Sequence, residues 1–256
     1  MGAFFYFSKM KYLCASLVLL FVISPAISQE IQLFGHRGAK GHAPENTVVS
    51  VKKALAFDVD GVEIDVFRCK SGEIVIFHDK SLDKLTNGSG KIEEKTLKQL
   101  STLKVLGSEP IPTLDKIIAV INGSAQLNIE LKGKNTAEGV FNIMKKAIKS
   151  GRWKADQLFV SSFDWDELRD FKKLTTEFGI AVLTDKNPLD AIPVARELNA
   201  FAINPKHSHL TQEIVNDIHS EGFEIHTWTV NKKKRIEELI SWKVDGIITD
   251  FPDMVF

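Results

Sequence analysis

Apolar residues along the chain follow two patterns that alternate with each other. Short runs rich in β-branched and aromatic residues predict strands, and segments with apolar residues every three or four positions predict helices. The predicted strands are residues 31–36, 62–66, 126–131, 157–161, 179–183, 200–204, 223–228 and 246–249. Clear helical patterns occupy residues 47–57, 136–149, 164–174 and 211–220.

This alternation favours a single closed barrel. Strand–helix units in succession, several of them with fully apolar strands, predict a parallel sheet closed into a (β/α)8 TIM barrel of the α/β class. An open doubly wound sheet is the alternative, and the lack of a GxGxxG turn after the first strand weakens it. No Pro/Gly/Ser-rich linker or internal repeat divides residues 29–256, so we expect one domain.

Two segments interrupt the alternation. Residues 74–77 have a strand pattern and follow the turn signal Ser71-Gly72, which predicts an antiparallel hairpin with the second barrel strand. A two-residue loop would place Asp65 opposite His78, and a three-residue loop would shift the pairing by one. The polar segment 79–112 predicts an insertion between the second and third barrel strands, over the rim where active sites of this fold lie.

The first 28 residues predict a signal peptide. Lys9 and Lys11 precede an apolar stretch at 13–24, and Ala26-Ile27-Ser28 has the small residues of a cleavage site. A transmembrane anchor is the alternative, but the stretch is shorter than the roughly 20 residues that span a bilayer. Met10 also begins a complete signal peptide, so a start there gives the same mature chain. We expect a secreted or periplasmic protein without a stable membrane span.

Composition narrows the classes of partner and site. The chain has 256 residues, of which 44% are hydrophobic and 26% charged, as in soluble globular proteins. Its formal net charge is zero, so no basic excess indicates a nucleic-acid partner. The 2 cysteines exclude a disulfide framework and argue against a cysteine-based zinc site. Cys69 remains after the signal peptide is removed, and we expect it to be buried.

Charged residues and histidines gather at the predicted carboxyl ends of strands. They are His36, Arg37, Glu63, Asp65, His78, Glu130 and Lys132. Glu63 and Asp65 are two residues apart on one strand, so their side chains leave the same face. In a barrel these strand ends meet at one rim, where three carboxylates would repel one another unless a cation neutralised them.

The ligand types indicate both the cation and the chemistry. Oxygen ligands alone select a hard ion, Mg²⁺ or Ca²⁺, over zinc. With two imidazoles beside the ion, one can accept a proton and the other can donate one, while Arg37 and the ion bind phosphate oxygens. A single histidine or Glu-Ile-Asp segment at a rim is more often structural. The joint placement of these residues at successive strand ends favours a site.

The same residues lie in motifs that resemble the glycerophosphodiester phosphodiesterase family. The motifs are His36-Arg37-Gly38, Pro44-Glu45-Asn46-Thr47, Gly61-Val62-Glu63-Ile64-Asp65-Val66, His78-Asp79, Leu85-Thr86-Asn87-Gly88-Ser89-Gly90, Ile111-Pro112-Thr113-Leu114, Asn128-Ile129-Glu130-Leu131-Lys132, Trp228-Thr229-Val230-Asn231 and Asp245-Gly246-Ile247-Ile248-Thr249-Asp250-Phe251-Pro252. They cover essentially the whole mature chain in the family's order. The resemblance implies hydrolysis of a small-molecule glycerophosphodiester to glycerol 3-phosphate and an alcohol.

The resemblance also implies an acid–base pair, His36 and His78, and three metal ligands, Glu63, Asp65 and Glu130. Only residues 67–72 depart from the common pattern, at a place where the family often has threonine and an Asp-Gly turn.

Four further residues receive roles in binding substrate or phosphate. Arg37 matches the arginine that contacts phosphate, and Lys132 would face the phosphate beside it. Glu45 would orient His36, Arg37 or the ion, or else would only stabilise the start of the first helix. Trp228 would pack against the glycerol, or else belong to the core.

Two other functions remain as alternatives. One is a lysophospholipase D or sphingomyelinase D-like activity on lipids, which a larger apolar surface at the insertion would favour. The other is a binding barrel without catalysis, which the presence of every expected residue disfavours. The nucleophile is either the glycerol 2-hydroxyl or a water, and which histidine is the base stays open, as does the oligomeric state.

Overall fold

The computed structural model describes residues 1–2 and 31–255. Most of the predicted signal peptide, residues 3–28, lies outside the described residues. Within the described part of the chain, no helix has both the length and the apolarity to cross a membrane.

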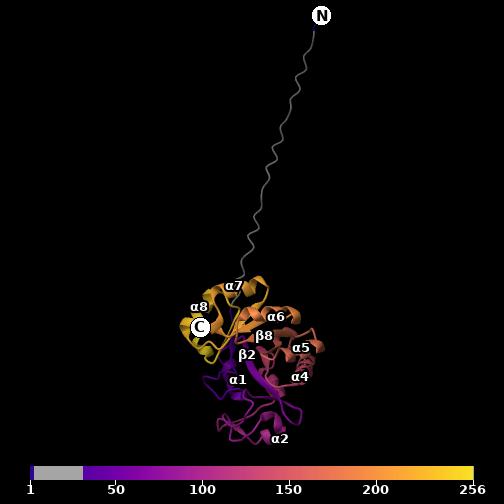
Figure 1. Cartoon of the computed structure of the whole chain (residues 1–256), viewed down its shortest axis with the longest axis vertical. Coiled ribbons are helices and arrows are strands. Elements are labelled where there is room, and N and C mark those ends of the chain that lie inside the picture. The colour runs from indigo at the N-terminus through magenta and orange to yellow at the C-terminus, as the bar shows by residue number, and fades with distance from the viewer. Residues whose placement is uncertain (3–30, 256) are drawn as a thin grey trace.

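Eight parallel strands form a closed barrel, which confirms the predicted fold (Figure 1). In chain order they are β1 (Gln32–Gly35), β2 (Gly61–Arg68), β6 (Gln126–Leu131), β7 (Leu158–Ser162), β8 (Gly179–Thr184), β9 (Ala202–Pro205), β10 (Glu224–Thr227) and β11 (Gly246–Thr249). Each strand pairs with the next, and β1 pairs with both β2 and β11, which closes the sheet. All eight predicted strands are therefore present.

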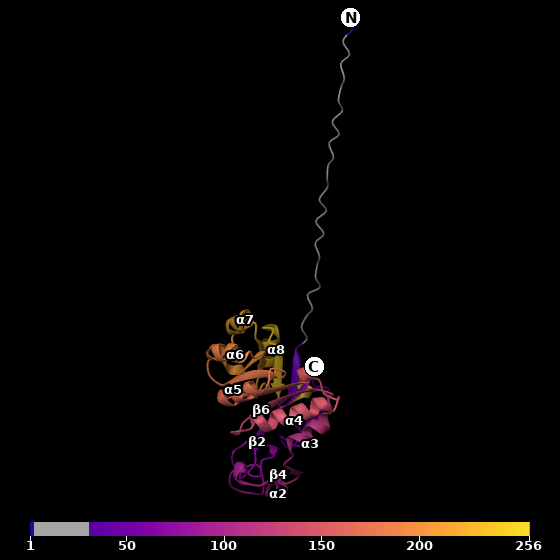
Figure 2. The ribbon, with the colours of Figure 1, turned by 90° about the vertical axis from the view of Figure 1, so that its right-hand side faces the viewer.

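Helices connect the strands around the outside of the barrel (Figures 1 and 2). They are α1 (Val48–Leu55), α3 (Leu114–Ile121), α4 (Ala137–Lys149), α5 (Trp165–Leu174), α6 (Ile192–Leu198), α7 (Gln212–Ser220) and α8 (Lys233–Ser241). The side chains of Thr47, Thr113 and Thr211 accept backbone N–H groups at the starts of α1, α3 and α7. The sequence pattern had not singled out α3, α6 or α8, of which α6 has a proline in its first turn.

Aromatic side chains fill the amino-terminal half of the barrel interior. The ring of Phe34 lies edge-on to that of Phe159 at 5.9 Å and 5.2 Å from the ring of His226. These rings need neighbours without side chains: a Cβ atom on Gly61 would lie 2.2 Å from Phe34, and one on Gly246 would lie 2.8 Å from His226. This end of the barrel is a packed core.

The predicted hairpin is present, with a different register from the one that a two-residue loop gives. Strand β3 (Ile74–Ile76) pairs antiparallel with β2. The N–H of Cys69 donates to the carbonyl of Glu73, and the N–H of Phe77 donates to the carbonyl of Asp65. The loop therefore has three residues and closes through Gly72 at φ 104°. Asp65 faces Phe77, so the pairing of Asp65 with His78 was wrong.

The insertion 79–112 folds around a hydrophobic cluster that it shares with the hairpin. It contains the short helix α2 (Leu97–Leu100) and the strands β4 (Lys104–Val105) and β5 (Glu109–Pro110). The shared cluster consists of Phe67, Cys69, Val75, Phe77, Leu82, Leu85, Ile92, Leu100, Val105 and Ile111. Cys69 is buried, as expected. In Figure 2 this region lies at the end of the molecule opposite α7.

Candidate active site

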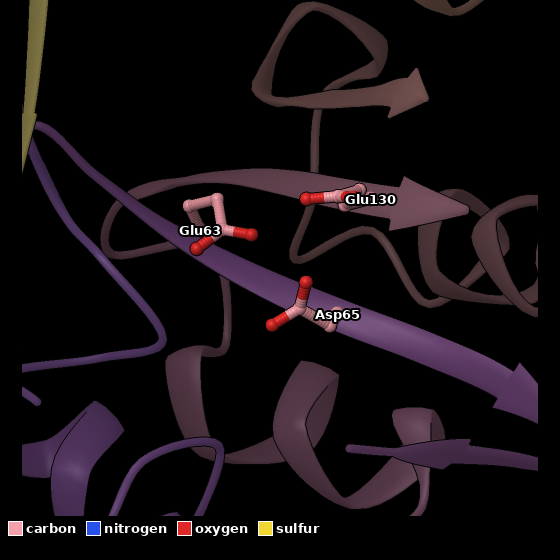
Figure 3. A group of neighbouring side chains, drawn as sticks. All are labelled: Glu63, Asp65 and Glu130. Atoms are coloured by element: carbon pink, nitrogen blue, oxygen red, sulfur yellow. The ribbon is translucent and has the colours of Figure 1, made fainter. Parts of the chain in front are cut away.

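Three carboxylates converge at the carboxyl end of the barrel. Glu63 and Asp65 leave the same face of β2, and Glu130 leaves β6 directly beside Asp65 in the sheet register. One oxygen of each carboxylate lies within 4.8 Å of the corresponding oxygens of the other two, and all three point toward one another (Figure 3). The predicted ligand set is therefore brought together.

Burial and mutual repulsion perturb these carboxylates strongly. Burial, with the charge of Asp65, raises the pKa of Glu130 to about 8. Burial and the charges of Asp65 and Glu130 raise the pKa of Glu63 well above its usual value. Burial acts to raise the pKa of Asp65 as well, but the positive charges of Arg37 and Lys132 help to hold that pKa below its usual range. Buried oxygen ligands of this kind fit a hard divalent cation.

An unusual backbone conformation places Arg37 against these carboxylates. Arg37 has a φ of 51°, and its N–H donates to Oε2 of Glu63 at 2.9 Å. Its guanidinium donates to Oε1 of Glu45 at 2.6 Å, and its Nε lies 3.2 Å from Oδ2 of Asp65. Glu45 thus contacts Arg37, one of the three targets considered for it. The left-handed turn continues through Gly38, where a Cβ atom would lie 2.4 Å from Oγ of Ser50.

Asn46 is a site residue that sequence reasoning missed. Its Nδ2 donates to Oδ2 of Asp65 at 2.8 Å, and its Oδ1 accepts the N–H of Asp65 at 3.2 Å. Asn46 therefore holds both the carboxylate and the backbone N–H of Asp65. Asn46 has a φ of 58°, a conformation that asparagine tolerates well. Its place in the Pro44-Glu45-Asn46-Thr47 motif was the available signal.

His36 is held by residues from the far end of the chain. Its Nδ1 lies 2.6 Å from Oδ1 of Asp250. Asp250 in turn accepts the side-chain N–H of Asn231 at 2.7 Å, and its backbone N–H donates to Oδ1 of Asn231 at 2.9 Å. Since a carboxylate only accepts hydrogen bonds, Nδ1 of His36 carries the proton. Its Nε2 has no proton and faces Glu63 of the acidic cluster. Asn231 and Asp250 lie in quoted motifs, but no role had been assigned to either.

Burial lowers the pKa of His36, although the hydrogen bond to Asp250 opposes the shift. At neutral pH the imidazole is therefore neutral, with Nε2 4.0 Å from Oε2 of Glu63. Burial acts to raise the pKa of Asp250, but the hydrogen bonds from His36 and Asn231 and the nearby positive charges together lower it.

His78 and Lys132 complete the polar rim. Nδ1 of His78 lies 2.5 Å from Oδ1 of Asp79, and burial lowers the pKa of the imidazole. Nζ of Lys132 lies 3.0 Å from Oε1 of Glu130 and 3.9 Å from Oδ1 of Asp65. Although burial opposes it, these two carboxylates raise the pKa of Lys132, so the ammonium stays charged.

These groups surround a partly enclosed cavity of about 70 Å³. Seven of the nine predicted site residues line it, whereas Glu45 and Asp65 lie behind the lining. Trp228 forms part of the wall, donates its indole N–H to the carbonyl of Asn204 at 2.8 Å and meets Phe163 edge-on at 5.3 Å. Phe163 is a further lining residue that the sequence did not indicate.

Known proteins share both the sequence and the fold. The sequence model described as "Glycerophosphoryl diester phosphodiesterase family" matches residues 36–254. A glycerophosphodiester phosphodiesterase of Caldanaerobacter subterraneus subsp. tengcongensis is 32% identical over 230 residues, which cover 86% of this chain and 94% of the relative. One from Bacillus altitudinis is 33% identical over 238 residues, covering 87% of this chain and 95% of the relative.

Solved structures agree with the sequence comparisons. An Oleispira antarctica phosphodiesterase, solved in complex with the product sn-glycerol-3-phosphate, superposes with a TM-score of 0.80 at 30% identity. The match covers 88% of this chain and 94% of that protein. A glycerophosphodiester phosphodiesterase from Thermotoga maritima has a TM-score of 0.75 at 26% identity, covering 88% and 96% of the two chains.

Proposed function

We propose, on the premise that this chain belongs to the glycerophosphoryl diester phosphodiesterase family and is an enzyme of that activity, that it releases glycerol 3-phosphate by metal-assisted acid–base catalysis. The observation that carries the proposal is the convergence of three buried carboxylates beside two imidazoles and an arginine. The product in the Oleispira antarctica structure, sn-glycerol-3-phosphate, supports the same substrate class.

Glu63, Asp65 and Glu130 would hold one divalent cation. When bound, Mg²⁺ or Ca²⁺ would neutralise these carboxylates and polarise a phosphoryl oxygen. Asn46 would keep Asp65 in position, because it hydrogen-bonds to both the side chain and the backbone of that residue.

Arg37 and Lys132 would bind the phosphate. Both cations lie against the acidic cluster, with Arg37 beside Asp65 and Lys132 beside Glu130. Glu45 lies against Nη1 of Arg37 and Asp65 against its Nε, which leaves Nη2 for phosphate oxygens. Trp228 would pack against the carbon chain of the glycerol.

His36 and His78 would move the protons. The Nδ1 atom of each is engaged by an aspartate, so each presents Nε2 to the reaction. One Nε2 accepts the proton of the nucleophile, which is the glycerol 2-hydroxyl or a water. The other histidine, as an imidazolium with a second proton on Nε2, donates that proton to the oxygen of the departing alcohol.

Release of glycerol 3-phosphate from several glycerophosphodiesters tests the proposal. We expect a chelator to abolish release and added Mg²⁺ or Ca²⁺ to restore it. His36→Ala and His78→Ala should each lower kcat by about 10²–10⁴-fold, whereas the exposed His209→Ala should not change it. Full activity in chelator-treated enzyme would contradict the metal requirement. Full activity in His36→Ala or His78→Ala would contradict the acid–base role of that histidine.

The lipid alternative is less well supported. An acyl chain needs an apolar surface beside the site, and the insertion was the place to look for one. Among the described residues of the insertion, Leu106 is the one large hydrophobic side chain that is strongly exposed, at 58%. A single exposed leucine does not make such a surface.

A further inference from the structure

A second and much larger cavity adjoins the partly enclosed one. It has a volume of about 590 Å³ and lies between Lys80, at the start of the insertion, and the first turn of α5. Glu130, Lys132 and Phe163 line both cavities. A phosphodiester bound at the carboxylates would therefore have one arm in each.

The sizes of the cavities indicate which arm lies where. If the proposed function holds, every substrate shares the glycerol phosphate portion, while the alcohol varies. The smaller cavity of about 70 Å³ is lined by both histidines and Arg37, which suits the constant portion, and the hollow of about 590 Å³ is open to solvent and has room for alcohols of different sizes. We propose that the larger cavity is the alcohol subsite, that Phe163 forms the wall between the two arms, and that Lys80 selects polyol or anionic alcohols over quaternary ammonium alcohols.

Phe163 has the position and exposure that such a wall requires. It directly follows β7, meets Trp228 edge-on at 5.3 Å and has Nζ of Lys132 5.8 Å from its ring centre. Even so, it is 39% exposed. A bound alcohol that covers this ring would bury apolar area that otherwise faces water.

The charges that line the larger cavity largely neutralise one another. Asp164 pairs with Lys134, and Asp166 pairs with Arg169 at 2.8 Å. Arg169 also binds Glu197, at 2.7 Å.

Lys132 likewise has a partner, because it lies 3.0 Å from Glu130. Lys80 differs from these residues, because no carboxylate of the described residues lies within 4.0 Å of its ammonium group. An unpaired cation beside the variable arm disfavours a second positive charge there and favours hydroxyl or anionic groups.

Competing head groups test this charge preference. Release of glycerol 3-phosphate would be measured for diesters whose alcohol is inositol, glycerol or choline, at low and high ionic strength. We expect kcat/KM for inositol to exceed that for choline by about fivefold at low salt, the size of one solvent-exposed charge interaction. Lys80→Glu should reverse the preference, and high salt should remove the difference in both proteins.

Lys84→Glu is the matched control, because Lys84 is also exposed on the insertion but does not line the cavity. It should keep the wild-type preference. An unchanged choline-to-inositol ratio in Lys80→Glu, or an equal change in Lys84→Glu, would overturn the role of Lys80. If wild-type protein released no glycerol 3-phosphate from any diester, the proposed function itself would fail, so the two failures are distinguishable.

Phe163→Ala tests the wall. We expect its KM to rise by about tenfold for all three alcohols while kcat changes less, because the ring binds substrate but moves no proton. Phe163→Leu, which keeps part of the apolar surface, should recover part of the loss. An unchanged KM in Phe163→Ala, with a melting temperature equal to that of the wild type, would overturn the assignment.

Discussion

The two ends of the barrel interior use the same strands for opposite purposes. On β1, Phe34 packs among aromatic rings, and His36 two residues later faces the carboxylates. On β2, Gly61 makes room for a ring, and Glu63 two residues later joins the acidic cluster. The amino end adds a buried apolar cluster inside the barrel to the larger core that the strands and helices share. The carboxyl end holds three carboxylates that repel one another, so this end does not serve the stability of the fold.

The largest expected effect separates activity from stability at the carboxyl end. Glu63→Gln keeps the shape of the side chain and an acceptor for the N–H of Arg37 but removes one charge. We expect kcat/KM to fall by about 10³-fold or more because a metal ligand is lost. Without added cation the melting temperature should rise, since one like charge is gone. Calorimetry with and without cation checks the second point, and activity within tenfold of wild type would contradict the first.

The next effect concerns Asp250, which holds His36. In Asp250→Asn the amide would donate to Nδ1, so the proton of the imidazole moves to Nε2 and blocks it. We expect kcat to fall by about 10²–10⁴-fold with little change in KM or melting temperature. Asp253→Asn is the matched control, because Asp253 also binds a histidine, His42 at 2.6 Å, away from the cavity. A rise in KM instead of a fall in kcat would assign Asp250 to substrate binding.

A change at the amino end should have the opposite signature. Phe159→Ala removes a buried ring that contacts Phe34, Phe201 and His226. The expected loss of stability is about 3–5 kcal/mol, measured by denaturant unfolding, and kcat of the folded protein should stay within about threefold. The exposed Leu106→Ala should cost less than about 0.5 kcal/mol. A large fall in kcat of folded Phe159→Ala would show that the two ends of the barrel are coupled.

The smallest effect is a pH dependence of the metal-free protein. The pKa of Glu130 rises to about 8 on folding, so near neutral pH the native state binds more protons than the unfolded state. This contribution to stability is complete below the unfolded pKa and is lost as the pH rises toward 8. We expect the melting temperature without cation to fall by a few degrees between about pH 5 and pH 8. The same slope in Glu130→Gln would contradict this origin.

The barrel and most of the site could be predicted because both depend on local sequence patterns. The predicted strands 126–131 and 246–249 coincide with β6 and β11, since alternating polar and apolar residues mark the first and adjacent isoleucines mark the second. The ligands could be found because charged residues at the ends of apolar strands stand out. The register of the hairpin could not, because it depends on whether the turn at Gly72 takes two residues or three.

The residues that orient the site were harder to identify for another reason. Asn46, Asn231 and Asp250 act through hydrogen bonds to residues 19 to 214 positions away in the chain. Short polar residues in loops are common, and their partners are fixed only when the barrel closes. Phe163 was missed because one aromatic after a strand is usually part of the core.

The bond between His36 and Asp250 joins residues 214 positions apart. A growing polypeptide acquires all three proposed metal ligands and both histidines by residue 130, before strands β7 to β11 have been made. Asp250, which orients His36, directly follows β11, the strand that closes the barrel against β1. Activity is therefore expected only once β11 has paired with β1 and Asp250 has reached His36, and a shorter chain would carry the three carboxylates and both histidines with His36 not yet oriented.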